Sequence, residues 1–182
     1  MKRRERQAVV IALMEALSEK GSWCGETHIQ KACYFLQELT NVPLKFTFVL
    51  YKYGPYSFDL RNEMTAMRAD GFITLNVQPP PYGPSLVPSQ HSKLIISRWH
   101  NTVFEYKRQI NFVANVVSNR QAHELEGLST ALYLSKKYRD RDPEECAKLF
   151  SGLKPHISEE KALHFLQQVE EIQRKWKRTS SR

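Results

Sequence analysis

Apolar residues recur at helical spacing through most of this chain, and that periodicity restricts its fold more than any other feature. The first helix is predicted over residues 5–20, with an apolar face formed by Val9, Val10, Leu13, Met14 and Leu17. Runs of β-branched and aromatic residues are confined to short stretches near residues 43–53, 72–75 and 93–97. The sequence therefore predicts a mainly α (α+β) protein with little sheet.

The elements predicted for residues 1–97 follow the order of a winged helix. A second helix, N-capped by Thr27, precedes the extended segment, and Ser57 is a suitable N-cap for a third helix. Residues 72–75 and 93–97 would then pair as a small β-ribbon. Because helix, turn, helix and ribbon is the winged-helix order, we expect residues 58–69 to occupy the position of the recognition helix.

A long helix is expected next, over residues 98–119. Its apolar residues alternate in steps of four and three, as in a heptad seam: Trp99, Val103, Tyr106, Ile110, Val113 and Val117. This seam fits either a helix that spans one core, which we favour, or a homodimer contact. Three further helices follow, one of them N-capped by Asp142 with Pro143 at its first position. We therefore expect residues 98–182 to form a helical bundle with a basic tail, packed with residues 1–97 as one compact unit.

The net charge of +8 lies in the two ends of the chain. Residues 1–7 carry four bases and one acid, residues 172–182 carry five bases and no acid, and residues 8–171 are neutral overall. Such ends act either as solubilising tails or as contacts to phosphate, and both alternatives stay open here. The candidate nucleic-acid contacts are Arg3, Arg4, Arg61, Arg68, Lys93, Arg98, Arg174, Lys175, Lys177 and Arg178. Residues 58–69 also contain Asp59 and Glu63, a mixed face that argues against strong sequence-specific recognition.

No group of residues has the spacing that catalysis or metal binding requires. The six histidines and three cysteines lack ligand spacing, and the chain contains neither a glycine-rich phosphate loop nor a nucleophile elbow. Cys33 falls on the apolar face of the second helix, where a thiol is usually inert. We therefore expect no catalytic residues, no metal and no cofactor. No apolar run is long enough to cross a bilayer, and the N-terminus does not resemble a signal peptide, so we expect a cytoplasmic protein without a membrane partner.

Three tyrosines and a lysine surround the Gly54-Pro55 turn: Tyr51, Lys52, Tyr53 and Tyr56. Aromatic residues at such a place either anchor the turn, which we favour, or recognise a partner. Lys31 and Tyr34 of the second helix join these four as candidate partner-binding residues.

Several motifs resemble those of the YwgA-like bacterial family and, more distantly, of the Panacea (SocA-like) antitoxin domain. The helix sequence KACYFL at residues 31–36 is similar to the K-L-x-Y-F/L helix of these families. It is followed, as in those families, by YGPYS at 53–57 and by GFI at 71–73. The segments LEGLSTALYL at 125–134 and LKPHIS at 153–158 resemble the YwgA-like group. The likeness covers most of residues 10–172, and none of its motifs is catalytic.

The resemblance implies a regulatory protein rather than an enzyme. Panacea-like proteins are regarded as antitoxins that neutralise varied toxins by direct contact, and some bacterial proteins of this general kind lie among mobile-element or defence genes. The implied partner is another protein, a toxin or a defence effector, and the alternative is a winged-helix regulator that binds nucleic acid. The proline-rich segment 79–84 and the basic tail 174–182 depart from the family pattern, which leaves a shared partner open.

Overall fold

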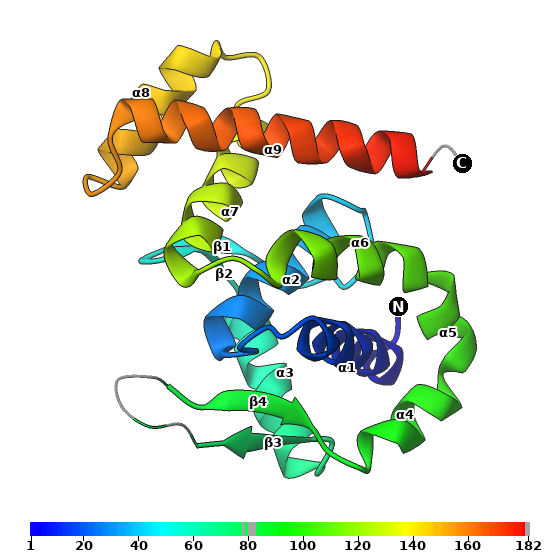
Figure 1. Cartoon of the computed structure of the whole chain (residues 1–182). Helices are drawn as coiled ribbons and strands as arrows, with labels where there is room; N and C mark the ends of the chain where they lie inside the picture. Colours follow the sequence, from blue (N-terminus) through cyan, green and yellow to red (C-terminus); the bar gives the residue numbers. More distant parts are fainter. Residues whose placement is uncertain (78, 80–82, 181–182) are drawn as a thin grey trace. The chain divides into compact units, whose positions relative to one another are not determined.

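The structure, a computed structural model, describes residues 1–77, 79 and 83–180 and is mainly helical, with two small two-stranded sheets (Figure 1). The chain divides into two compact units. Unit 1 contains residues 1–48 and 57–120, and unit 2 contains residues 49–56 and 121–182. The sequence predicted parts at 1–97 and 98–182 that form one compact unit. The division lies further along the chain because the segment after residue 98 packs on the first helix of unit 1.

Helix α1 (Arg3–Glu19) is the centre of unit 1. Its residues from Gln7 to Val10 are fully buried, as are Leu13, Met14 and Leu17. Helix α2 (Glu26–Glu38) begins at a cap formed by Gly25, so the predicted cap at Thr27 is wrong. The buried side chain of Gln30 in α2 both donates to the backbone carbonyl of Ser57 and accepts from its N–H, each at 2.9 Å. These two hydrogen bonds tie α2 to the start of the next helix of the unit.

Helix α3 (Phe58–Ala69) starts as the sequence predicts. The Ser57 hydroxyl accepts a hydrogen bond from the N–H of Leu60, which confirms the predicted N-cap. Strand β3 (Ile73–Asn76) follows and pairs antiparallel with β4 (Ser85–Pro88). The order α1, α2, α3, β3, β4 in unit 1 is therefore the order expected for a winged helix.

The predicted returning strand at 93–97 is wrong, because the chain already returns along β4 and residues 93–97 belong to helix α4 (Ser92–Arg98). Three consecutive apolar residues there suggested a strand. In the helix Ile95 is buried at 4% exposure, whereas Leu94 is 68% exposed. Within the proline-rich segment 79–84, residues 80–82 lie outside the described residues.

The predicted long helix at 98–119 is also wrong, because the chain bends twice. Trp99 separates α4 from α5 (His100–Glu105), Tyr106 separates α5 from α6 (Lys107–Val117), and α6 completes the segment. All three helices contact α1 and curve around it in Figure 1. One straight helix could not follow the surface of another through such a curve. The later seam residues, Ile110, Val113 and Val117, are buried, whereas Trp99, Val103 and Tyr106 are half-buried.

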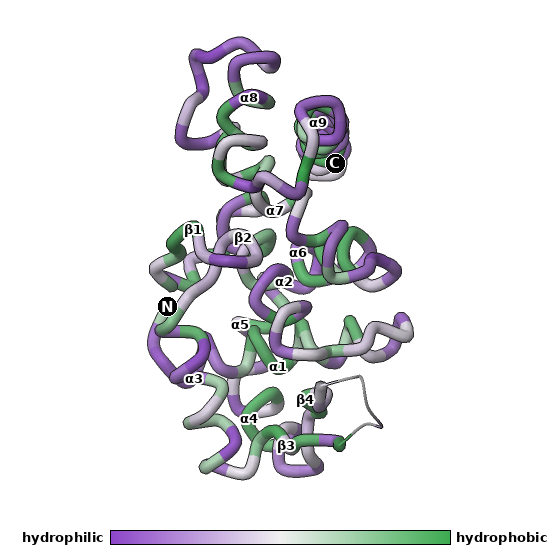
Figure 2. Tube along the Cα trace, turned by 90° about the vertical axis from the view of Figure 1, so that its left-hand side faces the viewer, coloured by the Kyte–Doolittle hydropathy of each residue, from purple (hydrophilic) through white to green (hydrophobic). Residues whose placement is uncertain are grey.

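Unit 2 combines a hairpin with three helices. Strands β1 (Val49–Tyr51) and β2 (Gly54–Tyr56) form the hairpin, and β2 packs on α7 (Ala122–Lys137). Helix α8 (Pro143–Leu153) has the predicted Asp142 cap, whose carboxylate accepts from the N–H of Glu144. Helix α9 (Glu159–Ser180) packs on α7 and α8 and carries both hydrophobic and hydrophilic positions (Figure 2). In the described part of the chain no helix combines the length and the apolar character needed to span a membrane.

The contact between α7 and α9 leads to a first prediction. A Cβ atom added at Gly127 would lie 2.3 Å from ring atoms of Phe165, whereas one added at Gly152 would meet nothing within 4 Å. We expect Gly127→Ala to lower the free energy of unfolding by about 1–3 kcal/mol, because Phe165 must move. Gly152→Ala should instead raise it by up to about 1 kcal/mol, because alanine favours the helix. Denaturant titration of both variants tests this, and equal stabilities would contradict the packing described.

Candidate interaction surfaces

The tip of the β1–β2 hairpin brings together three of the predicted partner-binding residues. Tyr51 is 56% exposed, Tyr53 is 57% exposed, and Lys52 between them is also exposed. The ring of Tyr51 lies 5.7 Å from that of Tyr56, and the Lys52 ammonium lies 5.2 Å from the centre of the Tyr53 ring. The tip therefore presents a compact aromatic and cationic surface.

A buried lysine holds this tip in place. The Lys154 ammonium donates a hydrogen bond of 2.9 Å to the carbonyl oxygen of Tyr51 and another to that of Lys52. It also forms an ion pair of 3.1 Å with Glu126 of α7, and both side chains are less than one-tenth exposed. Nε2 of His156 lies 3.4 Å from the same carboxylate oxygen. Lys154 therefore connects the hairpin backbone to α7 within unit 2, and removing either buried charge would leave the other uncompensated.

Close packing at Gly54 adds to this anchor. Gly54 has φ of +84° and lies against α7, where an added Cβ would be 3.0 Å from the hydroxyl oxygens of both Ser129 and Thr130. Gly54 and Pro55 are buried, whereas the tyrosines at the tip are exposed. Gly54, Pro55 and Lys154 thus anchor the turn, while the side chains of Tyr51 and Tyr53 are exposed. The sequence placed Lys154 in the LKPHIS motif but did not reveal its contact with the hairpin, which lies about a hundred residues away.

Lys31 and Tyr34, the other two predicted partner-binding residues, lie elsewhere. Both belong to α2 in unit 1, and each is only 2% exposed. The ring of Tyr34 packs edge-on against Phe48, with 5.0 Å between the ring centres. The prediction that Lys31 and Tyr34 contact a partner at the surface is therefore wrong, because both side chains lie in the interior.

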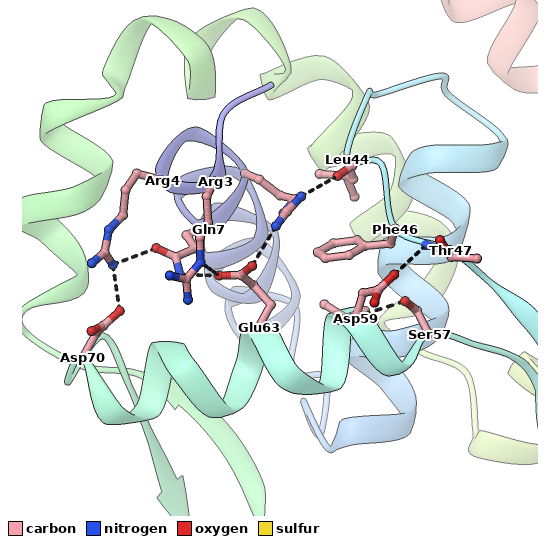
Figure 3. A network of polar contacts seen from close by, with 12 residues as sticks. Arg3, Arg4, Gln7, Leu44, Phe46, Thr47, Ser57, Asp59, Glu63 and Asp70 are labelled. Carbon is pink, nitrogen blue, oxygen red and sulfur yellow. Dashed lines mark hydrogen bonds and ion pairs between the residues drawn. The ribbon is translucent and has the colours of Figure 1, made fainter.

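Helix α3 presents a second surface. Of its two acidic residues, Glu63 is buried and Asp59 is hydrogen-bonded to the backbone. Glu63 is only 6% exposed and accepts hydrogen bonds from Arg3, Arg6 and Gln7 of α1 (Figure 3). Asp59 is exposed but accepts from the backbone N–H of Thr47 at 3.3 Å (Figure 3). The exposed residues of α3 that remain are mostly polar or basic: Arg61, Asn62, Thr65 and Arg68, together with Phe58 and Ala69. The sequence suggested a face of α3 with both acidic and basic side chains. Because Glu63 points inward, the exposed face is less acidic than the sequence suggested.

The N-terminal arginines are not a free tail. They lie in the first two turns of α1, and Arg3 and Arg6 form ion pairs with Glu63 at 3.0 and 2.7 Å. Arg4 forms an ion pair of 2.7 Å with Asp70, at the end of α3 (Figure 3). Their partners are about sixty residues away, so the sequence alone could not reveal these pairs. The structure thus gives Arg3 and Arg4 a role in holding α3, in addition to any contact they make with phosphate.

The other predicted nucleic-acid contacts are spread over three helices. Lys93 and Arg98 are exposed on α4 and not on the ribbon, whose strands β3 and β4 contain no basic residue. Arg174 forms an ion pair with Glu170 one turn earlier in α9. Lys175, Lys177 and Arg178 are exposed near the end of the same helix. The structure therefore groups only Arg61 and Arg68 on α3.

The three cysteines are buried in the structure. Cys33 is fully buried, and this burial raises the pKa of its thiol far above the usual range. Burial also raises the pKa values of Cys24 and Cys146. All three thiols are therefore protonated at neutral pH and poor nucleophiles. Within the described ranges, no three His, Cys, Asp or Glu side chains form a group that could hold a metal ion.

No protein-family model matches this chain, and no curated protein matches its sequence. The three motifs YGPYS, LEGLSTALYL and LKPHIS nevertheless meet in unit 2, since they contain Gly54, Glu126 and Lys154 respectively. Their sequences thus have a structural explanation in the anchoring of the hairpin.

The packing of the turn leads to a second prediction. Gly54→Val should lower the free energy of unfolding by at least about 2 kcal/mol, because it adds both backbone strain and a steric clash. Gly21→Ala is the matched control: Gly21 also has a positive φ of +74°, but an added Cβ would meet nothing within 4 Å. Thermal melts should show a clearly larger fall in midpoint for Gly54→Val. A normal midpoint combined with a loss of partner binding would make the turn itself a recognition site.

Proposed function

We propose that this chain is a non-enzymatic regulatory protein that binds another protein through the tip of the β1–β2 hairpin. The observation that carries the proposal is the exposure of Tyr51, Lys52 and Tyr53 on a backbone fixed by the buried Lys154. Tyrosine is enriched in protein interfaces, and a fixed backbone reduces the entropy lost on binding.

The proposed partner is a bacterial toxin or a phage-defence effector, which the chain would mask by direct contact in the cytoplasm. The resemblance to the YwgA-like family and to the Panacea antitoxin domain supports this class of partner. The buried thiols support a binding role rather than thiol catalysis.

The test compares two exposed aromatic surfaces. The double variant Tyr51→Ala/Tyr53→Ala should lose the partner that copurifies with the unaltered chain in its native cells. Against that purified partner, we expect affinity to fall about 30-fold or more, as for a binding hot spot. Phe104→Ala, which removes another aromatic side chain that is 66% exposed, is the matched control and should bind normally. Equal binding by both variants would contradict the proposal.

A second candidate function is nucleic-acid binding through α3, and a specific observation favours it. The burial of Glu63 leaves Arg61, Asn62 and Arg68 on the exposed face of the helix that occupies the recognition position in a winged helix. Strands β3 and β4 contain no basic residue, so in this reading α3 rather than the ribbon supplies the charge that contacts phosphate.

Salt dependence separates a contribution of α3 from that of the C-terminal tail. If α3 contacts phosphates, Arg61→Ala/Arg68→Ala should reduce the slope of log affinity against log salt by about 0.9 for each phosphate that the variant no longer neutralises. A chain ending at residue 173 measures how much of the affinity for nucleic acid comes from the C-terminal tail. Lys20→Ala is the control for removing a positive charge elsewhere. Deleting residues 1–7 is unsuitable, because Arg3, Arg4 and Arg6 hold α3. If only the truncated chain loses affinity, binding is carried by the tail.

A further inference from the structure

A polar cavity of about 320 Å³ lies beside the first two turns of α3, wholly within unit 1. It is lined by Arg3, Arg6, Lys45, Phe46, Asp59, Asn62 and Glu63. Three of these side chains are cationic and two are acidic, so the lining carries a net positive charge. The cavity contains no residue of the hairpin tip and shares only Asn62 with the exposed face of α3 described above.

The two acids of the cavity already have partners. Oε1 of Glu63 accepts from Nε of Arg3 and from Gln7, and Oε2 accepts from a terminal nitrogen of Arg6. Asp59 accepts from the N–H of Thr47. The acids are thus engaged with groups of unit 1.

Several donors of the cavity have no such engagement. Within the described part of the chain, the ammonium of Lys45 and the amide of Asn62 form no hydrogen bond or ion pair, and both side chains are exposed. Arg3 pairs with Glu63 through Nε and is 56% exposed, which leaves its two terminal nitrogens for another acceptor. Nε of Arg6 is buried and has no hydrogen-bond partner. Donors therefore exceed acceptors in this cavity.

The backbone of Lys45 points to the same conclusion. Its φ is +61°, in the left-handed region that costs energy for a residue with a side chain. Such strain persists where the surrounding structure holds a residue in place, often at a ligand site. Here it accompanies a lysine side chain that lines the cavity.

We propose that this cavity binds a phosphate group, held by Arg3, Lys45 and Asn62. The guanidinium of Arg3 offers paired donors that match phosphate oxygens, Lys45 supplies a point charge, and Asn62 donates a neutral hydrogen bond. The phosphate comes either from a small phosphate or phosphate monoester, or from the backbone of a nucleic acid lying along α3.

Titration with inorganic phosphate, followed by amide NMR at constant ionic strength with chloride as the reference anion, tests the site. We expect saturable shifts confined to the amides of residues 44–47 and 59–63 of the full chain. Lys45→Gly removes the charge while accepting the positive φ, so it should fold normally and weaken binding about tenfold or more. Asn41→Gly is the matched control, because Asn41 also has a positive φ, of +59°, but does not line the cavity.

Competition distinguishes the two sources of phosphate. If an unrelated DNA duplex shifts the same amides and displaces phosphate, the site takes a backbone phosphate. If phosphate binds and the duplex does not compete, the site takes a small phosphate ligand. Both results support the cavity as a phosphate site. Shifts that match those with chloride, that lie elsewhere, or that persist unchanged in Lys45→Gly would overturn it.

Discussion

The burial of Glu63 determines how unit 1 is arranged. A carboxylate that is only 6% exposed needs cationic or hydrogen-bonding partners, and α1 supplies three of them in Arg3, Arg6 and Gln7. These contacts lock the start of α1 to the middle of α3. Arg3 and Arg6 of the basic N-terminus thereby have a structural role, and the carboxylate of Glu63 points away from the exposed face of α3. Both candidate roles of this unit, nucleic-acid contact and phosphate binding, depend on that one buried group.

Unit 2 uses a buried charge in a different way. Lys154 joins a carboxylate of α7 to two backbone carbonyls of the hairpin, so a single side chain connects parts of the chain that are far apart in sequence. Because the acceptors are backbone carbonyls, the Lys154 hydrogen bonds do not require a particular side chain at the hairpin tip. A substitution at Tyr51 or Tyr53 would therefore leave the acceptors of the Lys154 hydrogen bonds in place.

The sequence predicted those features that depend on neighbouring residues. Ser57 and Asp142 were identified as helix caps because a cap acts within three residues, and the structure confirms both. The mainly helical fold followed from apolar periodicity. The bends at Trp99 and Tyr106 could not be predicted, because they arise where α4, α5 and α6 curve around α1. The partners of Glu63 and Lys154 were also beyond prediction, because each pair joins residues more than twenty-five positions apart.

The chain passes from unit 1 to unit 2 at 48/49, returns at 56/57 and leaves again at 120/121. During synthesis the hairpin therefore emerges from the ribosome well before α7 and Lys154, on which its position depends. Its exposed tyrosines and its backbone carbonyls remain unsupported until residues 121–154 have followed. A chain that ends before Lys154 therefore lacks the contacts that hold the hairpin in the finished protein.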